Sequence, residues 1–271
     1  MSILEQTLAA LADDLRSRRV DVQPVGQTLN VAQGQGLMAH KANIDPVALV
    51  ERLEATPAAG HRRLIAGFAS GVKHVLMEPS RSRAADWTFV ESTGGLVPNL
   101  EVDTFILGAE AASGESPWVL PFADDIVVAY LIELDRGLRV LTASQTKRWG
   151  VTRDRITSAA RSILFHKTRT ATPEPHEDFQ LVQVIQVGDE YDAVRALVIA
   201  DAFYSDIDES FRFSLPAQDL FYFVPSDSPD HLQALRQATD QTFTAATYPL
   251  SSRLFRFELG RPTPFDDEQH P

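Results

Sequence analysis

Residues 126–134 read IVVAYLIEL, and this stretch decides the fold class. Side chains 126–132 are apolar on both faces of the period-two alternation, which is typical of a strand buried in the middle of a sheet. Asp135-Arg136-Gly137 then predicts a tight turn, and residues 138–141 return as a second strand. We therefore expect a hairpin whose first strand is interior.

Amphipathic helices are predicted on either side of this hairpin. Leucines recur at helical spacing between residues 4 and 15, with charged side chains on the opposite face. Thr152 is suited to cap a helix that runs to about Lys167. Further helices are predicted at residues 46–55, at residues 58–77 and from residue 228 onward.

Short apolar or alternating segments bounded by turn residues predict the remaining strands. They lie at residues 20–23, 27–32, 37–40, 179–187, 211–215, 219–224 and 253–259. Residues 193–200 fit either a strand or a helix. Residues 80–115 are the hardest to interpret, with weak strand signals around Leu100 and at residues 105–107.

These elements predict an α+β protein with mainly antiparallel sheets covered by helices, arranged in two lobes. The expected N-terminal lobe spans residues 1–150, the C-terminal lobe spans residues 151–262, and residues 263–271 are expected to be a frayed tail. The prediction depends on residues 126–134 and 219–224 being interior strands.

Composition excludes several classes of function. The chain of 271 residues has no cysteine, which rules out disulfides and thiolate nucleophiles and fits a reducing cytoplasm. Its net charge of -12 opposes nucleic-acid binding. No apolar run reaches the roughly 18 residues of a membrane helix, and the acidic N-terminal segment is unlike a signal peptide. We expect a cytoplasmic protein that binds neither nucleic acid nor membrane.

Three segments carry a resemblance to a known family. Residues 123–164 read ADDIVVAYLIELDRGLRVLTASQTKRWGVTRDRITSAARSIL, residues 215–224 read LPAQDLFYFV, and residues 248–255 read YPLSSRLF. Together they resemble the YtpQ-like family of uncharacterised bacterial proteins. That family has a polar or basic pair just before the aspartate of the second segment, where this chain has Ala217-Gln218. The resemblance implies no activity.

Two glycine motifs favour structure over chemistry. Residues 34–39, GQGLMA, fit a dinucleotide fingerprint, but the break at Asp45-Pro46 leaves no helix beside the glycines, which favours a hairpin turn. Residues 67–71, GFASG, place Ser70 one position too late for a nucleophile elbow. Small residues in a helical stripe instead predict close helix packing.

Histidines and acids offer weaker signals. The seven histidines include no pair at helical spacing, so a helical metal pair is not predicted. His166, His176 and Glu177 flank an evident loop, and a hydrolytic or metal site there is the minor alternative to a plain loop. The acidic residues between 201 and 209 lack EF-hand spacing and predict a solvated loop. We expect no metal and no cofactor.

Four residues are the binding-site candidates. Asp219 and Arg253 each begin an apolar strand, and if those strands are neighbours the two side chains would form a bidentate pair. Asp125 and Tyr130 lie at and within the central strand segment. No catalytic residue is predicted.

The leading hypothesis is a non-catalytic binding or protein-interaction module, because no nucleophile, metal or phosphate motif is recognisable. One alternative is a hydrolase or transferase that uses the four candidates in a groove between the lobes. Another is an acidic inhibitor or immunity-type partner of a basic protein, which the net charge permits. A carboxylate of perturbed pKa in a cleft would favour the enzyme, and an apolar patch rimmed by acids would favour the inhibitor.

Overall fold

The computed structural model describes the chain except for residues 1, 34–39, 78–85, 136, 203–206 and 266–271. The chain forms two compact units. Unit 1 comprises Met1–Val97, Glu101–Leu120 and Ala129–Ile156, and unit 2 comprises Pro98–Leu100, Pro121–Val128 and Thr157–Pro271. Pro98–Leu100 and Pro121–Val128 thus belong to the same unit as the C-terminal residues. The expected lobes, 1–150 and 151–262, place these two segments in the N-terminal lobe instead.

Unit 1 begins with the predicted amphipathic helix α1 (Ile3–Ser17). The Ser2 hydroxyl accepts a hydrogen bond from the backbone N–H of Glu5, and the Glu5 carboxylate accepts one from the N–H of Ser2. This reciprocal cap satisfies two donors that the first turn leaves open. Leu11 and Leu15, from the leucine stripe of this helix, are fully buried.

The strands predicted at residues 20–23 and 27–32 correspond to β1 (Asp21–Val25) and β2 (Thr28–Gln33), which form an antiparallel sheet with β3 (His40–Ile44) in the order β1-β2-β3. Gly26 has a φ of 61°, which suits the two-residue turn between β1 and β2. The third strand begins at His40, where the sequence-based prediction for it ended. The dinucleotide-like residues 34–39 lie outside the described residues.

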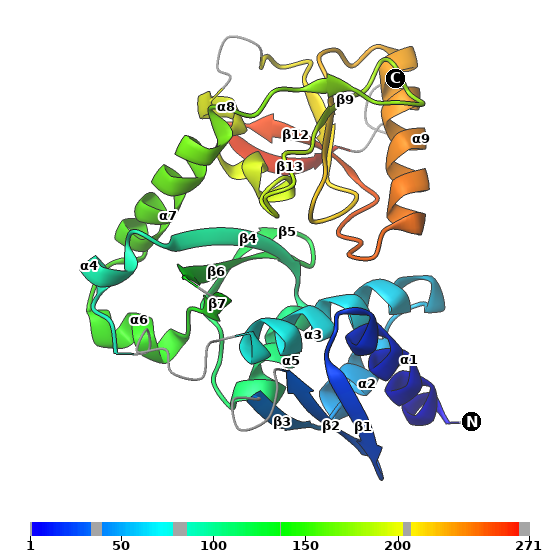
Figure 1. Ribbon diagram of the computed structural model, residues 1–271. Coiled ribbons are helices and arrows are strands. Elements are labelled where there is room, and N and C mark those ends of the chain that lie inside the picture. Colours follow the sequence, from blue (N-terminus) through cyan, green and yellow to red (C-terminus); the bar gives the residue numbers. More distant parts are fainter. Residues whose placement is uncertain (1, 34–39, 78–85, 136, 203–206, 266–271) are drawn as a thin grey trace. The chain divides into compact units, whose positions relative to one another are not determined.

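Helix α2 (Val47–Glu54) and a short 3-10 turn (Ala58–Gly60) lead into α3 (His61–Leu76). Helix α3 packs closely on α5 (Thr104–Ser113), as Figure 1 shows. A Cβ added to Gly71 would lie 2.2 Å from the carbonyl oxygen of Phe105, and one added to Gly108 would lie 2.0 Å from that of Phe68. Only glycine permits this approach, so the packing interpretation of the GFASG motif is confirmed.

The weak strand prediction at residues 105–107 is wrong, because these residues belong to α5. A short apolar run has no periodicity that separates a buried strand from a buried helix. The weak strand signal around Leu100 is confirmed by β4 (Leu96–Val102), all of whose residues are buried. Two helices have no counterpart in the prediction: the short α4 (Phe89–Ser92) and α6 (Ala143–Trp149), which Thr142 caps.

The predicted hairpin is confirmed as β6 (Ile126–Leu134) and β7 (Gly137–Val140), which pair antiparallel. Strand β6 lies between β4 and β5 (Val119–Ala123), so it is interior. The long helix α7 (Arg153–Thr168) follows and agrees with the predicted cap and length.

A six-stranded sheet forms the core of unit 2, and its described strands pair antiparallel. Its order is β13-β12-β10-β11-β9-β8. The strands are β8 (Glu174–Pro175), β9 (Gln183–Ile185), β10 (Arg212–Ser214), β11 (Phe221–Val224), β12 (Leu254–Glu258) and β13 (Arg261–Phe265). Strand β11 lies between β10 and β9, which confirms the second interior strand. Residues 193–200 form a 3-10 helix (Ala193–Leu197) and the start of α8 (Ile199–Ala202).

The two faces of this sheet differ in chemistry. Phenylalanines 211, 213, 221, 223, 255 and 257 contact one another ring to ring. Tyr222, Val224 and Leu254 pack instead with residues of α9 (Pro229–Ala245), which runs beside the strands in Figure 1. Tyr222 thereby reaches helix α9 from the middle of the sheet.

Strand β13 is the edge of this sheet and contains two prolines. Pro262 lies opposite Phe257, and Pro264 lies opposite Phe255. The strand continues to Phe265, so residues 263–265 belong to the sheet and not to a frayed tail. Within the described residues, no helix is both long and apolar enough to cross a membrane.

Candidate functional site

The four sequence-based candidates do not form one site. Tyr130 is buried in unit 1 and packs against Trp118, with ring centroids 4.7 Å apart. Asp125 and Asp219 lie in turns of unit 2, before β6 and before β11. The condition for an Asp219–Arg253 pair is not met, because β10 separates β11 from β12. Arg253 pairs instead with Asp124, at 2.9 Å.

Asp219 does lie beside a hollow. Two recesses of about 380 and 520 Å³ adjoin each other in unit 2, and both are lined by His176, Leu220 and Tyr222. The first also includes Glu174, Glu177 and Gln186, and the second includes Asp178, Asp219, Thr242 and Tyr248. We call the two together the His176 recess.

His176 holds the loop that walls this recess. Its Nδ1 accepts hydrogen bonds from the backbone N–H groups of Asp178, at 3.1 Å, and Phe179, at 3.3 Å. The backbone N–H of His176 donates a hydrogen bond to the backbone carbonyl of Val182, at 2.8 Å. The ring meets the rings of Phe179 and Tyr222 edge to face, each at 5.2 Å. Residues 176–182 are thus a closed loop with an imidazole at its centre.

This geometry fixes the tautomer of His176. A nitrogen that accepts two N–H groups carries no proton, so the proton of the neutral ring sits on Nε2. A histidine that acts as a general base or binds a metal through Nε2 needs the opposite tautomer, with Nδ1 donating to a neighbour. The arrangement therefore makes His176 a cap for the loop.

Tyr222 supplies the floor that the two recesses share. Its side chain is buried, and its hydroxyl lies 3.0 Å from Oγ1 of Thr242 on α9. Burial raises the pKa of Tyr222, because the phenolate is poorly solvated there, and the nearby Asp219 carboxylate adds to the rise. The phenol is neutral at physiological pH, and its hydroxyl is engaged with Thr242.

Four carboxylates surround these rings: Glu174, Glu177, Asp178 and Asp219. All four residues are exposed, and none forms an ion pair with a described residue. The described lining residues include no lysine or arginine. The recess is therefore a polar and aromatic hollow with a negative rim.

Ser70, His74 and Glu101 in unit 1 are a second arrangement worth testing as chemistry. The Ser70 hydroxyl donates to Glu101 at 3.1 Å and lies 3.3 Å from Nδ1 of His74. That Nδ1 also lies 2.9 Å from the Ser70 carbonyl and donates to it, so it is no base for the hydroxyl. Ser70 and Glu101 are 2% and 1% exposed, which makes this polar packing inside unit 1.

Burial lowers the pKa of His74 to about 4, partly opposed by its hydrogen bond to Ser70. The ring packs edge to face on Phe105 of α5, with centroids 5.6 Å apart. His74 is therefore a neutral side chain within the α3–α5 contact at physiological pH.

A buried ion cluster holds residues 187–195, which we call the 187–195 loop. Arg195 is fully buried and donates to both carboxylate oxygens of Asp189, at 2.9 and 2.8 Å, and to Asp192, at 2.8 Å. Asp192 also accepts the N–H groups of Val187 and Gly188. Each charge is paired within the cluster, so the cluster positions the loop.

The two carboxyls of this cluster have opposite shifts. Burial raises the pKa of Asp192 more than the hydrogen bond from Val187 and the charge of Arg195 lower it. Burial also acts to raise the pKa of Asp189, but there the hydrogen bonds and charge of Arg195 prevail and lower it.

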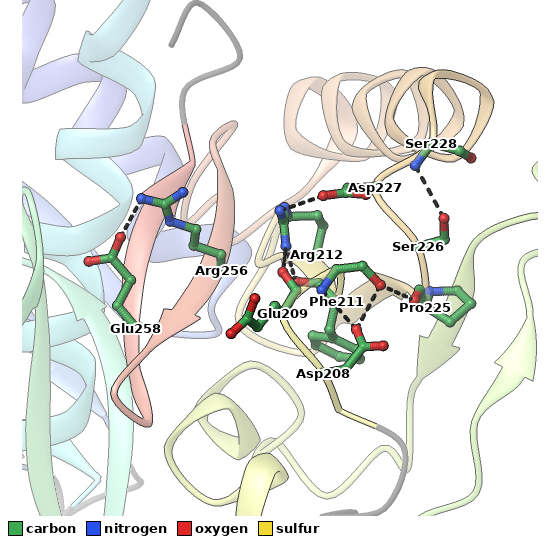
Figure 2. A network of polar contacts seen from close by, with 11 residues as sticks. Asp208, Glu209, Phe211, Arg212, Pro225, Ser226, Asp227, Ser228, Arg256 and Glu258 are labelled. Atoms are coloured by element: carbon green, nitrogen blue, oxygen red, sulfur yellow. Dashed lines mark hydrogen bonds and ion pairs between the residues drawn. The ribbon is translucent and has the colours of Figure 1, made fainter. Parts of the chain in front are cut away.

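A third polar network surrounds Arg212 (Figure 2). Its guanidinium donates to Asp227 at 2.7 Å and to the backbone carbonyls of Glu209 and Phe211, and it lies over the ring of Phe265 at 4.4 Å. A recess of about 680 Å³ beside it is lined by charges of both signs, including Asp227 and Arg236. Internal pairing of Arg212 explains this network.

The other charged groups singled out from the sequence have local partners. Asp201 pairs with Arg161 at 2.7 Å, and Asp208 accepts hydrogen bonds from Ser210 at the following turn. Asp206 lies outside the described residues. His166 is on α7 and is not among the residues that line the His176 recess. Within the described part of the chain, no group of three His, Asp or Glu side chains is placed to hold a metal ion.

Comparison with known proteins finds no matching family model, no matching curated protein and no matching solved structure. The resemblance to YtpQ-like proteins is therefore still a prediction from the sequence.

Sequence reasoning named His176 and Glu177 together with His166, and it named Asp219 with Arg253, but it did not bring His176, Glu177 and Asp219 into one site. It missed Tyr222 and Thr242 altogether. One signal in the sequence could have indicated them. Thr242 lies three positions after Thr239, next to the apolar stripe of the predicted helix, and a polar side chain that is buried there needs a hydrogen-bond partner. Tyr222, between two phenylalanines of a strand, is that partner.

Proposed function

We propose that unit 2 is a non-catalytic binding module whose His176 recess holds a basic segment of a partner protein. The observation that carries the proposal is the lining itself. Four exposed carboxylates surround a tyrosine and a histidine ring, and the described lining residues include no lysine or arginine to neutralise them.

The chemistry of the recess suits arginine and lysine side chains. Their N–H groups donate to carboxylates in charge-assisted hydrogen bonds, and a cation also lies favourably over an aromatic face. Two adjoining hollows that share one floor accommodate two neighbouring side chains of one segment. A net charge of -12 steers basic partners toward the chain before contact.

Binding accounts for the side chains better than catalysis does. The Nδ1 lone pair of His176 is used by two backbone N–H groups. The Tyr222 hydroxyl is buried, and the pKa shift keeps it neutral. Both residues thus serve as fixed surfaces, which is what a preformed binding site requires.

We further infer kinship with YtpQ-like proteins from the three segments quoted above. Two of those segments contribute Asp219, Tyr222 and Tyr248 to the recess. This kinship predicts that YtpQ-like proteins bind basic peptides at the same recess. Failure of a YtpQ-like protein to bind the peptide described next would argue against this link.

The test is a titration with a rhodamine-labelled peptide, acetyl-Gly-Arg-Gly-Lys-Gly-Arg-Gly-amide, read by fluorescence anisotropy at pH 7.5. We expect saturable binding that weakens with salt, and none for a peptide with glutamate at each basic position. The double variant Glu177→Gln, Asp219→Asn should weaken binding by about ten-fold, since two exposed charge pairs are lost.

Glu54→Gln is the matched control, because Glu54 is an exposed carboxylate on α2 of unit 1 with no ion pair among the described residues. Its affinity should match that of the wild type. Equal binding of the two peptides would show that charge does not drive binding. An equal loss of affinity per charge removed in the control and in the double variant would show that net charge alone acts. Either result would show that the recess is not the site.

A further inference from the structure

The His176 loop has a feature that ordinary capping loops lack. Serine, threonine, aspartate and asparagine are the usual side chains that accept backbone N–H groups at such turns. Here the acceptor is an imidazole, whose lone pair is lost when the ring takes up a proton. Histidine is also the side chain that titrates between pH 5 and 8. The loop therefore depends on His176 carrying no proton at Nδ1.

Protonation at Nδ1 has two consequences at this position. The N–H groups of Asp178 and Phe179 lose their acceptor and face a third N–H donor, so the loop that walls both hollows can no longer close in the same way. The ring also gains a positive charge on the surface shared by the two hollows. Both effects oppose a basic ligand.

Several charged and titratable groups line the two hollows together with His176. Glu174 belongs to β8, and Glu177 and Asp178 belong to the loop itself. Asp219 lies in the turn before β11, Tyr222 lies on β11, and Tyr248 follows α9. The four carboxylates attract a cation at this surface, whether it is a basic side chain of a ligand or a protonated ring. A bound basic segment neutralises them, so ligand and proton compete for the same negative field.

We infer that protonation of His176 releases the ligand from this recess, so that binding is switched off by mild acid; the inference rests on the proposed function. Linkage requires the converse as well. Ligand binding must displace a proton from His176 whenever the pH is low enough for the ring to be partly charged.

The experiment measures binding of the unlabelled Arg- and Lys-containing peptide by isothermal titration calorimetry at pH 7.5 and pH 5.5. The wild type should lose about ten-fold or more in affinity at pH 5.5. Titrations at pH 6.5 in buffers of different ionisation enthalpy should show proton release on binding. Far-UV circular dichroism confirms that the chain is folded at each pH.

Two variants separate the effect of His176 protonation from the role of His176 as the hydrogen-bond acceptor that holds the loop. In His176→Asn the amide oxygen still accepts the two N–H groups but does not titrate, so affinity should be nearly equal at both pH values. His176→Ala removes the acceptor, so affinity should be low at both.

The outcomes distinguish the two proposals. If the wild type binds equally well at pH 7.5 and 5.5, or if His176→Asn loses affinity in acid as the wild type does, the switch is refuted while the binding site stands. If the peptide does not bind at pH 7.5, the proposed function fails first.

Discussion

The α3–α5 contact of unit 1 and the 187–195 loop of unit 2 both depend on buried groups, but they are held by opposite means. The helices meet through glycines, with no side chain between Gly108 and the carbonyl of Phe68. The loop closes on Arg195, a fully buried cation with two carboxylate partners. One contact depends on the absence of atoms and the other on matched charges.

The difference teaches where each region is vulnerable. A close-packed contact fails when atoms are added, because interiors have almost no spare volume. A buried charge cluster fails when one member is removed, because the others are left unpaired in a medium that solvates them poorly. Adding a methyl group should therefore destabilise the α3–α5 contact, whereas removing a charged side chain should destabilise the 187–195 loop.

The largest expected effect is the loss of Arg195. Arg195→Met leaves Asp189 and Asp192 without their cation and should lower the free energy of unfolding by about 3–5 kcal/mol. The measurement is urea unfolding followed by circular dichroism and tryptophan fluorescence.

Arg161→Met is the matched control, because Arg161 pairs with Asp201 at a similar distance of 2.7 Å but in exposed surroundings. It should cost at most about 1 kcal/mol. Similar losses in the two variants would show that burial does not set the strength of the cluster.

The next effect tests the glycine contact. Gly108→Ala places a methyl group 2.0 Å from the carbonyl oxygen of Phe68, so α3 and α5 must separate. The free energy of unfolding should fall by about 1–3 kcal/mol. Gly94→Ala adds the same methyl group where nothing lies within 4 Å, and it should be neutral within about 0.5 kcal/mol. A neutral Gly108→Ala would mean that the helices do not pack this closely.

The smallest effect uses pH to compare the regions. The pKa of His74 is about 4 in the folded chain against 6.5 ordinarily, so its contribution to stability is present above pH 6.5 and is lost as the pH falls toward 4. Between pH 7 and 5.5 the loss should be about 1 kcal/mol. His74→Leu should remove that slope, as urea unfolding at both pH values would show.

The charge cluster should not share this slope. The pKa of Asp189 lies below its ordinary value of 3.8, so its contribution is lost only in stronger acid. The raised pKa of Asp192 acts in the opposite sense, because protonating that buried carboxyl favours the folded chain. If the free energy of unfolding of His74→Leu falls between pH 7 and 5.5 as steeply as that of the wild type, groups other than His74 cause the loss of stability near pH 6.

Much of the fold could be predicted because its elements carry local signals. Strand β6 is apolar on both faces, α1 has a leucine stripe and its own cap, and α9 opens on Ser228-Pro229. Helix α5 could not be predicted in the same way. Its Phe105-Ile106-Leu107 run carries no periodic signal, and the close approach of Gly108 to α3 that accompanies the helix is a tertiary contact.

The candidate site was harder for the same reason. His176 and Asp219 are 43 positions apart in the chain and meet at one recess only when β9 and β11 pair. The capping role of His176 depends on a hydrogen-bond direction, which residue types do not encode. Sequence reasoning named His176, Glu177 and Asp219, but it supplied neither Tyr222 and Thr242 nor the arrangement of these residues.

The two prolines of β13 have a consequence for the whole molecule. Glu258 and Arg261 flank a two-residue turn, so the ladder alternation directs the nitrogens of Pro262 and Pro264 outward, where neither has a hydrogen to donate. A strand from another chain would find half of its hydrogen-bonding partners missing along that rim. The sheet therefore stops at β13, and fibre growth by edge-to-edge stacking is blocked on this side.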